Sequence, residues 1–180
     1  RAIGVEAVAA EAGISKRTLY NHFASKDALI EAYLARRSVP LPSPADDPLA
    51  EILASFDRLE ETFRRGDFRG CPFVNAVAEI GDRRHGAARL AVAFKADREA
   101  WMRRRLTALG VADPDGLAVQ IRLLVEGAIA TMLVRGDPLV AGAAREAART
   151  LLAAAGLAVP TAAPARGRRL PPPRRRPAAP

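Results

Sequence analysis

The sequence predicts an all-α protein, with a short N-terminal pair of helices followed by a larger helical body. Apolar residues recur at helical spacing in one segment after another. Glycine, proline and aspartate separate these segments, and no alternation of β-branched residues typical of strands occurs. The chain has 180 residues, of which 49% are hydrophobic, so it is long enough to bury a core.

The first predicted helix covers residues 5–12, where Val5, Val8 and Ala12 fall on one face. Gly13 follows the last apolar position, and helices commonly end in a left-handed residue that glycine adopts without steric cost. Ile14 is apolar within the turn, so we expect it to fill the angle between two helices.

A second short helix is predicted after Ser15, whose hydroxyl suits the N-cap. The two helices and their glycine corner form a helix-turn-helix, which lays its second helix in the major groove of DNA. Lys16, Arg17 and Thr18 fill the first turn of that helix. Arginine and lysine side chains reach guanine O6 and N7, and threonine contacts a phosphate or a thymine methyl.

This segment resembles the tetracycline-repressor (TetR) family of bacterial transcriptional regulators. The match reads Val8-Ala9-x-x-Ala12-Gly13-Ile14-Ser15-Lys16-x-Thr18-Leu19-Tyr20-x-His22-Phe23-x-Ser25-Lys26-Asp27-x-Leu29. The resemblance implies DNA contacts, mostly to phosphates, from Tyr20, Asn21 and His22. Together with Ser15, Lys16, Arg17, Thr18 and Lys26, these residues form the predicted DNA-binding set. Family heads begin with one further helix, which we expect a chain opening at Arg1 to lack.

A third helix is predicted from Ser25 to Leu34 and corresponds to the connecting helix of the family. Four prolines between Ser38 and Pro48 then mark a boundary. The predicted domains are an incomplete DNA-binding head at 1–37 and a ligand-binding and dimerisation body at 48–157. Body helices are expected at 49–65, 72–79, 86–109, 114–135 and 138–155, the last two capped by Asp113 and Asp137.

Residues 160–180 are rich in proline, alanine and arginine and are expected to be disordered. Six arginines lie in the last fifteen residues, and removing their charges from the net +8 leaves +2. The tail is interpreted either as a solvated segment of no consequence or as a basic arm for nucleic acid. The high net charge is therefore poor evidence for DNA binding by itself.

Composition also argues against several classes of protein. The single cysteine, Cys71, excludes an internal disulfide framework and fits the cytoplasm. Cys71, Asn75 and His85 superficially resemble a catalytic set, but no supporting motif accompanies them, so we expect no enzyme. We expect no metal site, no cofactor and no transmembrane helix.

An effector pocket is predicted in the body, because aromatic walls with a few polar anchors suit a small apolar ligand. The candidate walls are Phe56, Phe63, Phe73, Phe94 and Trp101, and the candidate anchors are Asn75, Glu79 and Glu126. Each aromatic residue has the alternative of simply filling the core. Glu126 has the alternatives of a surface position or a pair with Arg122 one turn earlier.

Two functions remain open from the sequence. The first is a ligand-responsive regulator, most simply a repressor, which binds a palindromic double-stranded operator as a homodimer and responds to a small, largely apolar effector. Helices 114–135 and 138–155 are expected to form its dimer as a four-helix bundle. The second is a helical interaction module, or a remnant, that does not bind DNA.

Overall fold

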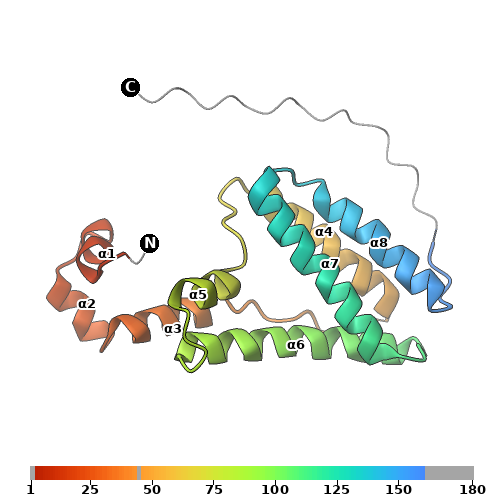
Figure 1. The fold of residues 1–180 in the computed structure, drawn as a ribbon, viewed down its shortest axis with the longest axis horizontal. Coiled ribbons are helices and arrows are strands. Elements are labelled where there is room, and N and C mark those ends of the chain that lie inside the picture. The colour runs from red at the N-terminus through yellow and green to blue at the C-terminus, as the bar shows by residue number, and fades with distance from the viewer. Residues whose placement is uncertain (1–2, 44–45, 161–180) are drawn as a thin grey trace, which may run out of the picture.

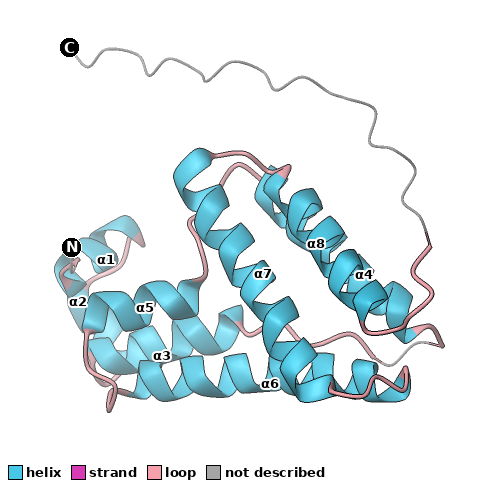
Figure 2. Cartoon of the chain, turned by 45° about the vertical axis from the view of Figure 1, so that its right-hand side comes forward, coloured by secondary structure: helices cyan, strands magenta, loops and turns pink. Residues whose placement is uncertain are grey.

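The computed structural model describes residues 3–43 and 46–160 of the chain. Over these residues the protein consists of eight α-helices without a strand, which confirms the all-α prediction (Figures 1 and 2). The helices are α1 (Val5–Glu11), α2 (Lys16–His22), α3 (Lys26–Arg37), α4 (Pro48–Arg64), α5 (Pro72–Ile80), α6 (Gly86–Ala108), α7 (Pro114–Arg135) and α8 (Val140–Ala154). Apart from Pro160, the predicted tail at 160–180 lies outside the described residues.

The predicted signals of the head are present at atomic detail. Gly13 has a φ of 66°, in the left-handed region that its place after α1 requires. Ser15 Oγ accepts a hydrogen bond from the backbone N–H of Thr18 at 3.0 Å, and Ser25 Oγ accepts one from Ala28 at 3.1 Å. Ile14, which was expected to fill the angle between the two helices, is 38% exposed and so is only partly covered there.

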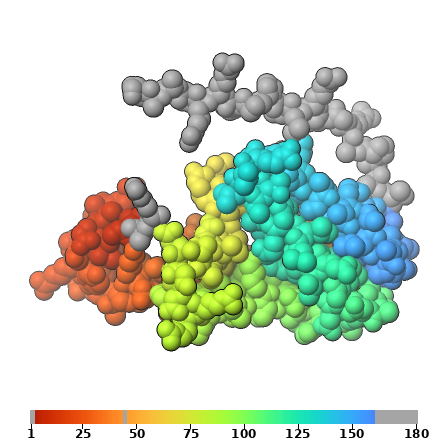
Figure 3. Space-filling view, viewed as in Figure 1, coloured from red at the N-terminus to blue at the C-terminus, as the bar shows by residue number. Residues whose placement is uncertain are grey.

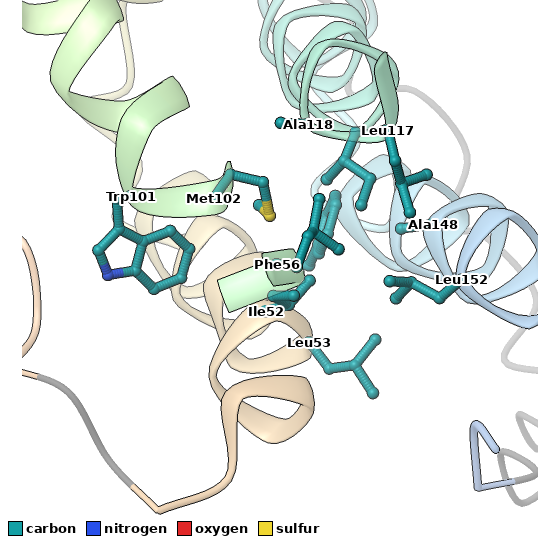
Figure 4. Close-up of a cluster of buried hydrophobic side chains, with 11 residues drawn as sticks. Ile52, Leu53, Phe56, Trp101, Met102, Leu117, Ala118, Ala148 and Leu152 are labelled. Atoms are coloured by element: carbon teal, nitrogen blue, oxygen red, sulfur yellow. The ribbon is translucent and has the colours of Figure 1, made fainter. Parts of the chain in front are cut away.

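The largest core cluster lies where α4, α6, α7 and α8 meet (Figure 4). Phe56 of α4, Leu106 of α6 and Leu152 of α8 are almost completely buried there. Burial of such side chains is the main favourable term in folding, at about 1.5–3 kcal/mol for each. This cluster holds four body helices together.

A second cluster joins the head to the body. Leu34 of α3 is fully buried and packs with Phe73 of α5 and with Ala87 and Ala91 of α6. A third, smaller cluster around Phe63 and Ala128 joins α4, α7 and α8. Although α3 follows the DNA-binding helices in sequence, its packing places it against the body.

The predicted helix boundaries in the body hold to within two residues. Asp113 Oδ1 accepts a hydrogen bond from Gly116 N–H at 2.8 Å, as predicted for the start of α7. Asp137 Oδ1 accepts one from Leu139 N–H at 3.0 Å, but α8 begins only at Val140 because residues 138–139 form a turn.

Helix α7 departs from the expectation on membrane spans. Its length and its mean hydropathy of 1.8 over an 18-residue window are enough to cross a membrane, although only 22% of that window is buried inside the protein. One such helix is weak evidence, since core helices of globular proteins pass the same test.

The assignment of the core predicts that two apolar truncations on α6 lower the free energy of unfolding by very different amounts. Leu106→Ala should lower the free energy of unfolding by about 2–5 kcal/mol, because Leu106 is fully buried and its removal leaves a cavity. Val92→Ala, at a residue that is 71% exposed, should change it by less than about 0.5 kcal/mol. Urea unfolding followed by circular dichroism measures both, and equal losses would contradict the assignment.

Candidate DNA-binding surface

Helix α2 lies at the end of the molecule farthest from α8 (Figures 1 and 3). Leu19 is 5% exposed and packs on the side that faces α1, where Ala9 is also buried. With that face occupied, Arg17 and Tyr20 are exposed. Asn21 and His22 are exposed as well, whereas Thr18 is partly buried. The local fold thus presents most of the predicted DNA-contacting side chains to solvent.

Lys16 does not stand alone on this surface. Its ammonium group donates to the carboxylate of Glu6 on α1, and both side chains are more than half exposed. This hydrogen bond, with the accompanying charge attraction, raises the pKa of Lys16 and lowers the pKa of Glu6. By contrast, none of the carboxylates in residues 3–43 and 46–160 forms an ion pair with Arg17. Arg17 is therefore the better placed cation for contact with a base.

The hydroxyl groups at the start of α2 contact each other. Ser15 Oγ and Thr18 Oγ1 lie 2.8 Å apart, while Ser15 also accepts the Thr18 N–H. These bonds order the first turn of α2. Because the hydroxyl groups of Ser15 and Thr18 already bond to each other and to the Thr18 N–H, they have fewer hydrogen bonds left to offer to DNA than the sequence suggested.

The start of α3 is fixed to the body through Asp27, the neighbour of Lys26. Asp27 Oδ1 lies 3.2 Å from His85 Nε2, at the start of α6. His85 Nδ1 accepts a hydrogen bond from Ala87 N–H at 3.0 Å, which assigns the proton of the neutral ring to Nε2. Lys26 is partly buried at this junction, so it is less accessible than the polar residues of α2.

Known proteins share both this motif and the whole architecture. A family model described as "Bacterial regulatory proteins, tetR family" matches residues 1–33. A crystal structure of a protein described as a TetR transcriptional regulator from Streptomyces avermitilis is 38% identical. It covers 86% of this chain and 88% of its own, with a TM-score of 0.76. The chain belongs to the TetR family.

A second solved structure agrees with this assignment. A TetR-family transcriptional regulator from Streptomyces coelicolor is 26% identical and covers 86% of each chain, with a TM-score of 0.77. No curated protein matches the chain. The DNA-binding head and the helical body of this TetR-family protein thus both have solved counterparts.

The five aromatic residues predicted to line an effector pocket are distributed over three clusters. Phe56 and Trp101 belong to the largest core cluster. Phe73 and Phe94 stack on each other in the second, with ring centroids 3.9 Å apart. Phe63 lies in the third cluster. A cavity of about 710 Å³ beside α4 and α7 is lined by Phe63, Phe68, Arg64, Arg69 and Met132, among others, so it includes only one of the five.

The predicted polar anchors do not form one group either. Asn75 is exposed and donates through Nδ2 to the Arg69 carbonyl at 2.6 Å, beside that cavity. Glu79 is exposed on α5. Glu126 accepts from Arg122 at 2.7 Å, which is the alternative that the sequence left open, and from Lys95 at 2.5 Å.

The sequence did not single out Lys95, which pairs with Glu126, or Arg98, which packs on Phe94. Both lie on α6 near its aromatic residue Phe94, and Arg98 places its guanidinium 4.2 Å from the Phe94 ring centroid. The residues considered for catalysis from the sequence, Cys71, Asn75 and His85, have structural contacts instead. His85 directs its two ring nitrogens at Ala87 and Asp27, and Cys71 is buried in the second cluster.

The Lys16–Glu6 pair predicts that Glu6 restrains DNA binding. Glu6→Gln should raise affinity for duplex DNA a few-fold, because it removes an anion next to the phosphates and releases the Lys16 ammonium. Glu11→Gln, at another exposed carboxylate of α1, serves as the control with the same change in net charge. Fluorescence anisotropy at several salt concentrations measures both, and an equal effect of the two variants would count against the role of Glu6.

Proposed function

We propose that this TetR-family regulator is a ligand-responsive cytoplasmic repressor that binds a palindromic operator as a homodimer. The observation that carries the proposal is the position of α2. It is exposed at one end of the molecule, with its polar and cationic side chains outward. A helix held in this way can enter the major groove without rearrangement of the body.

The contacts proposed for DNA follow from the chemistry of the exposed side chains. Arg17 is long, cationic and without a carboxylate partner among the described residues, so it suits the O6 and N7 atoms of guanine. Tyr20, Asn21 and His22 follow on the same helix and are exposed, and Lys26 begins α3; their side chains suit phosphate oxygens, which supply affinity rather than sequence choice. Ser15 and Thr18 order the first turn of α2, and together with Lys16 they add contacts to the DNA phosphates.

The dimer is proposed to form through an exposed apolar stripe on α7. Val119 and Leu123 are 44% and 65% exposed, and Val134 is 85% exposed. Gly127 and Ala130 lie between them on the same helical face and are exposed too. Small residues in the middle of such a stripe allow two helices to approach closely, and a two-fold axis brings the same stripe from each subunit together. Two α7–α8 pairs would then form a four-helix bundle.

The stripe also accounts for the hydropathy of α7. The opposite side of this helix, with Leu117, Ile121 and Ala128, packs into the core of the same subunit. A helix that is apolar on both sides is expected when one side faces the core and the other a partner subunit.

The DNA contacts predict distinct effects of three substitutions in the full-length protein. Arg17→Ala should weaken operator binding by about 1–3 kcal/mol and relax the sequence preference at one base pair. Tyr20→Phe should weaken binding to all sequences about equally. Arg104→Ala, at an exposed arginine of α6, should leave binding nearly unchanged. Footprinting and anisotropy provide the measurements.

A result opposite to these would defeat the repressor proposal. If the full-length protein protects no palindrome in neighbouring promoters, specific operator binding is refuted. If Arg104→Ala weakens binding as much as Arg17→Ala, net charge rather than α2 accounts for the affinity.

The stripe predicts which substitution separates the subunits. Leu123→Glu should produce a monomer at micromolar concentration, because two carboxylates would be buried near the two-fold axis. Val92→Glu, on α6, introduces the same charge at an equally exposed apolar residue and should leave the dimer intact. Light scattering measures the mass. Leu124 and Leu152 are unsuitable for this purpose, because they pack in the core of their own subunit.

A further inference from the structure

The loop between α5 and α6 carries two neighbouring arginines at the DNA-binding end of the molecule. Residues 81–85 read Gly-Asp-Arg-Arg-His, and Figure 2 shows this loop at the same end as α1 and α2. Arg83 and Arg84 are both exposed. Their position beside the DNA-binding helices makes the loop a candidate for contact with the same duplex.

His85 ties this loop to the start of α3. Its Nε2 lies 3.2 Å from Asp27 Oδ1, and Asp27 follows Lys26, for which we propose a phosphate contact. Arg83 precedes His85 by two residues, and two residues of chain span at most about 7 Å. The backbone of Arg83 therefore stays close to the start of α3 and to a phosphate bound there.

Hydrogen bonds hold the backbone of the loop in one shape. Asp82 Oδ1 accepts from the Arg84 N–H at 2.8 Å, and the Asp82 carbonyl accepts from the His85 N–H at 3.2 Å. From α6, Arg89 Nη1 donates to the Arg84 carbonyl at 2.6 Å. A loop fixed in this way loses little conformational entropy when its side chains bind a partner, so less of the interaction energy is lost to ordering.

Two carboxylates of α3 that lie near the loop are turned toward α6. Asp27 faces His85, and the Glu31 carboxylate lies against Gly86, where the lack of a side chain makes room for it. The first residues of a helix carry partial positive charge, which favours carboxylates at this place. The start of α6 thus holds both acids, which limits their attraction for the arginines of the loop.

Asp82 is the acid next to the two arginines, and it neutralises only part of their charge. Its Oδ1 lies 3.8 Å from Arg84 Nε, which is longer than a hydrogen bond, and the Arg84 side chain is 95% exposed. No carboxylate in residues 3–43 and 46–160 forms an ion pair with Arg83. The loop therefore offers an exposed guanidinium group for which a phosphate is a suitable acceptor.

We propose that the α5–α6 loop is a second DNA-contacting site, in which Arg83 binds a phosphate next to the one bound at the start of α3. Arg84 adds to the positive potential beside it. This inference rests on DNA binding by α2 in the proposed function and adds a contact from the body. Phosphate contacts carry no sequence information, so the loop supplies affinity and fixes the orientation of the body on the duplex.

The test measures binding of the full-length protein to a random-sequence duplex by fluorescence anisotropy at several salt concentrations. Each phosphate that a cation neutralises adds about 0.9 to the steepness of log affinity against log salt. Arg83→Gln should therefore make this slope less steep by about 0.9 for each bound subunit, so that its deficit shrinks about threefold per subunit between about 50 and 200 mM salt. Arg104→Gln removes the same charge from an exposed residue about 27 Å along α6 from its start, and should leave the slope unchanged.

Arg83→Lys separates the charge from the shape of the side chain. Lysine keeps a positive charge without the planar fork, so this variant should keep the slope and lose less affinity than Arg83→Gln. Thermal melting checks that each variant is folded. Equal slopes for Arg83→Gln and Arg104→Gln would overturn the inference, and so would a slope in Arg83→Lys that falls as far as in Arg83→Gln.

A second measurement locates the contact on an operator. Single phosphates are replaced in turn by neutral methylphosphonate. At one position in each half-site the unaltered protein should lose affinity while Arg83→Gln loses almost none, because that phosphate has already lost its partner in the variant. If every position weakens both proteins equally, Arg83 has no phosphate partner and the inference is refuted.

Failure of this inference is distinguishable from failure of the proposed function. The salt dependence on a random-sequence duplex needs no operator, and footprinting of the unaltered protein needs no variant. A protected palindrome with an unchanged slope in Arg83→Gln refutes only the loop contact. A less steep slope in Arg83→Gln without a protected palindrome refutes the repressor and supports the loop contact.

Discussion

The packing of α3 against α6 is the constraint on which the position of the DNA-binding helices depends. Before α3, only Ala9 and Leu19 are buried among the described residues of the head, so α1 and α2 have little core of their own. Leu34 supplies the missing anchor, because it is fully buried among residues of α5 and α6. The direction of α2 is therefore set by α3, and the direction of α3 is set by the body.

Two polar contacts fix α3 along its length. His85, at the start of α6, contacts Asp27 at the start of α3, and Arg98 contacts Val39 just beyond its end. Asp27 stands at the start of α3 and Val39 just beyond its end, and their partners His85 and Arg98 are about 20 Å apart along α6, so both contacts form when the two helices lie side by side and parallel. Figure 2 shows this arrangement. With one contact at each end, α3 is held against α6 along its whole length rather than at a single point.

The sequence predicted the local structure well and the long-range contacts poorly, for physical reasons. Caps such as Ser15, Ser25 and Asp113 act within four residues, so their partners follow from spacing alone. The spacing of the aromatic residues in the body does not reveal their partners, because these lie on other helices. Phe56, Phe63 and Phe73 suit a core and a pocket equally, and only the fold assigns them to three clusters. Lys95 was missed because its partner, Glu126, lies 31 residues away on another helix.

Helix α7 has a different environment on each of three faces, which explains why its composition is ambiguous. Leu117 and Ile121 face the core, and Val119 and Leu123 face solvent on the proposed dimer side. Arg122 stands next to Leu123 in sequence, about 100° around the helix. Arg122 pairs with Glu126, which also accepts from Lys95 of α6, so a rotation of α7 that turned the Leu123 stripe would also break this link to α6. In the proposed dimer the same stripe would meet its copy across the two-fold axis, so the packing of α7 on α6 would also set the separation of the two DNA-binding heads.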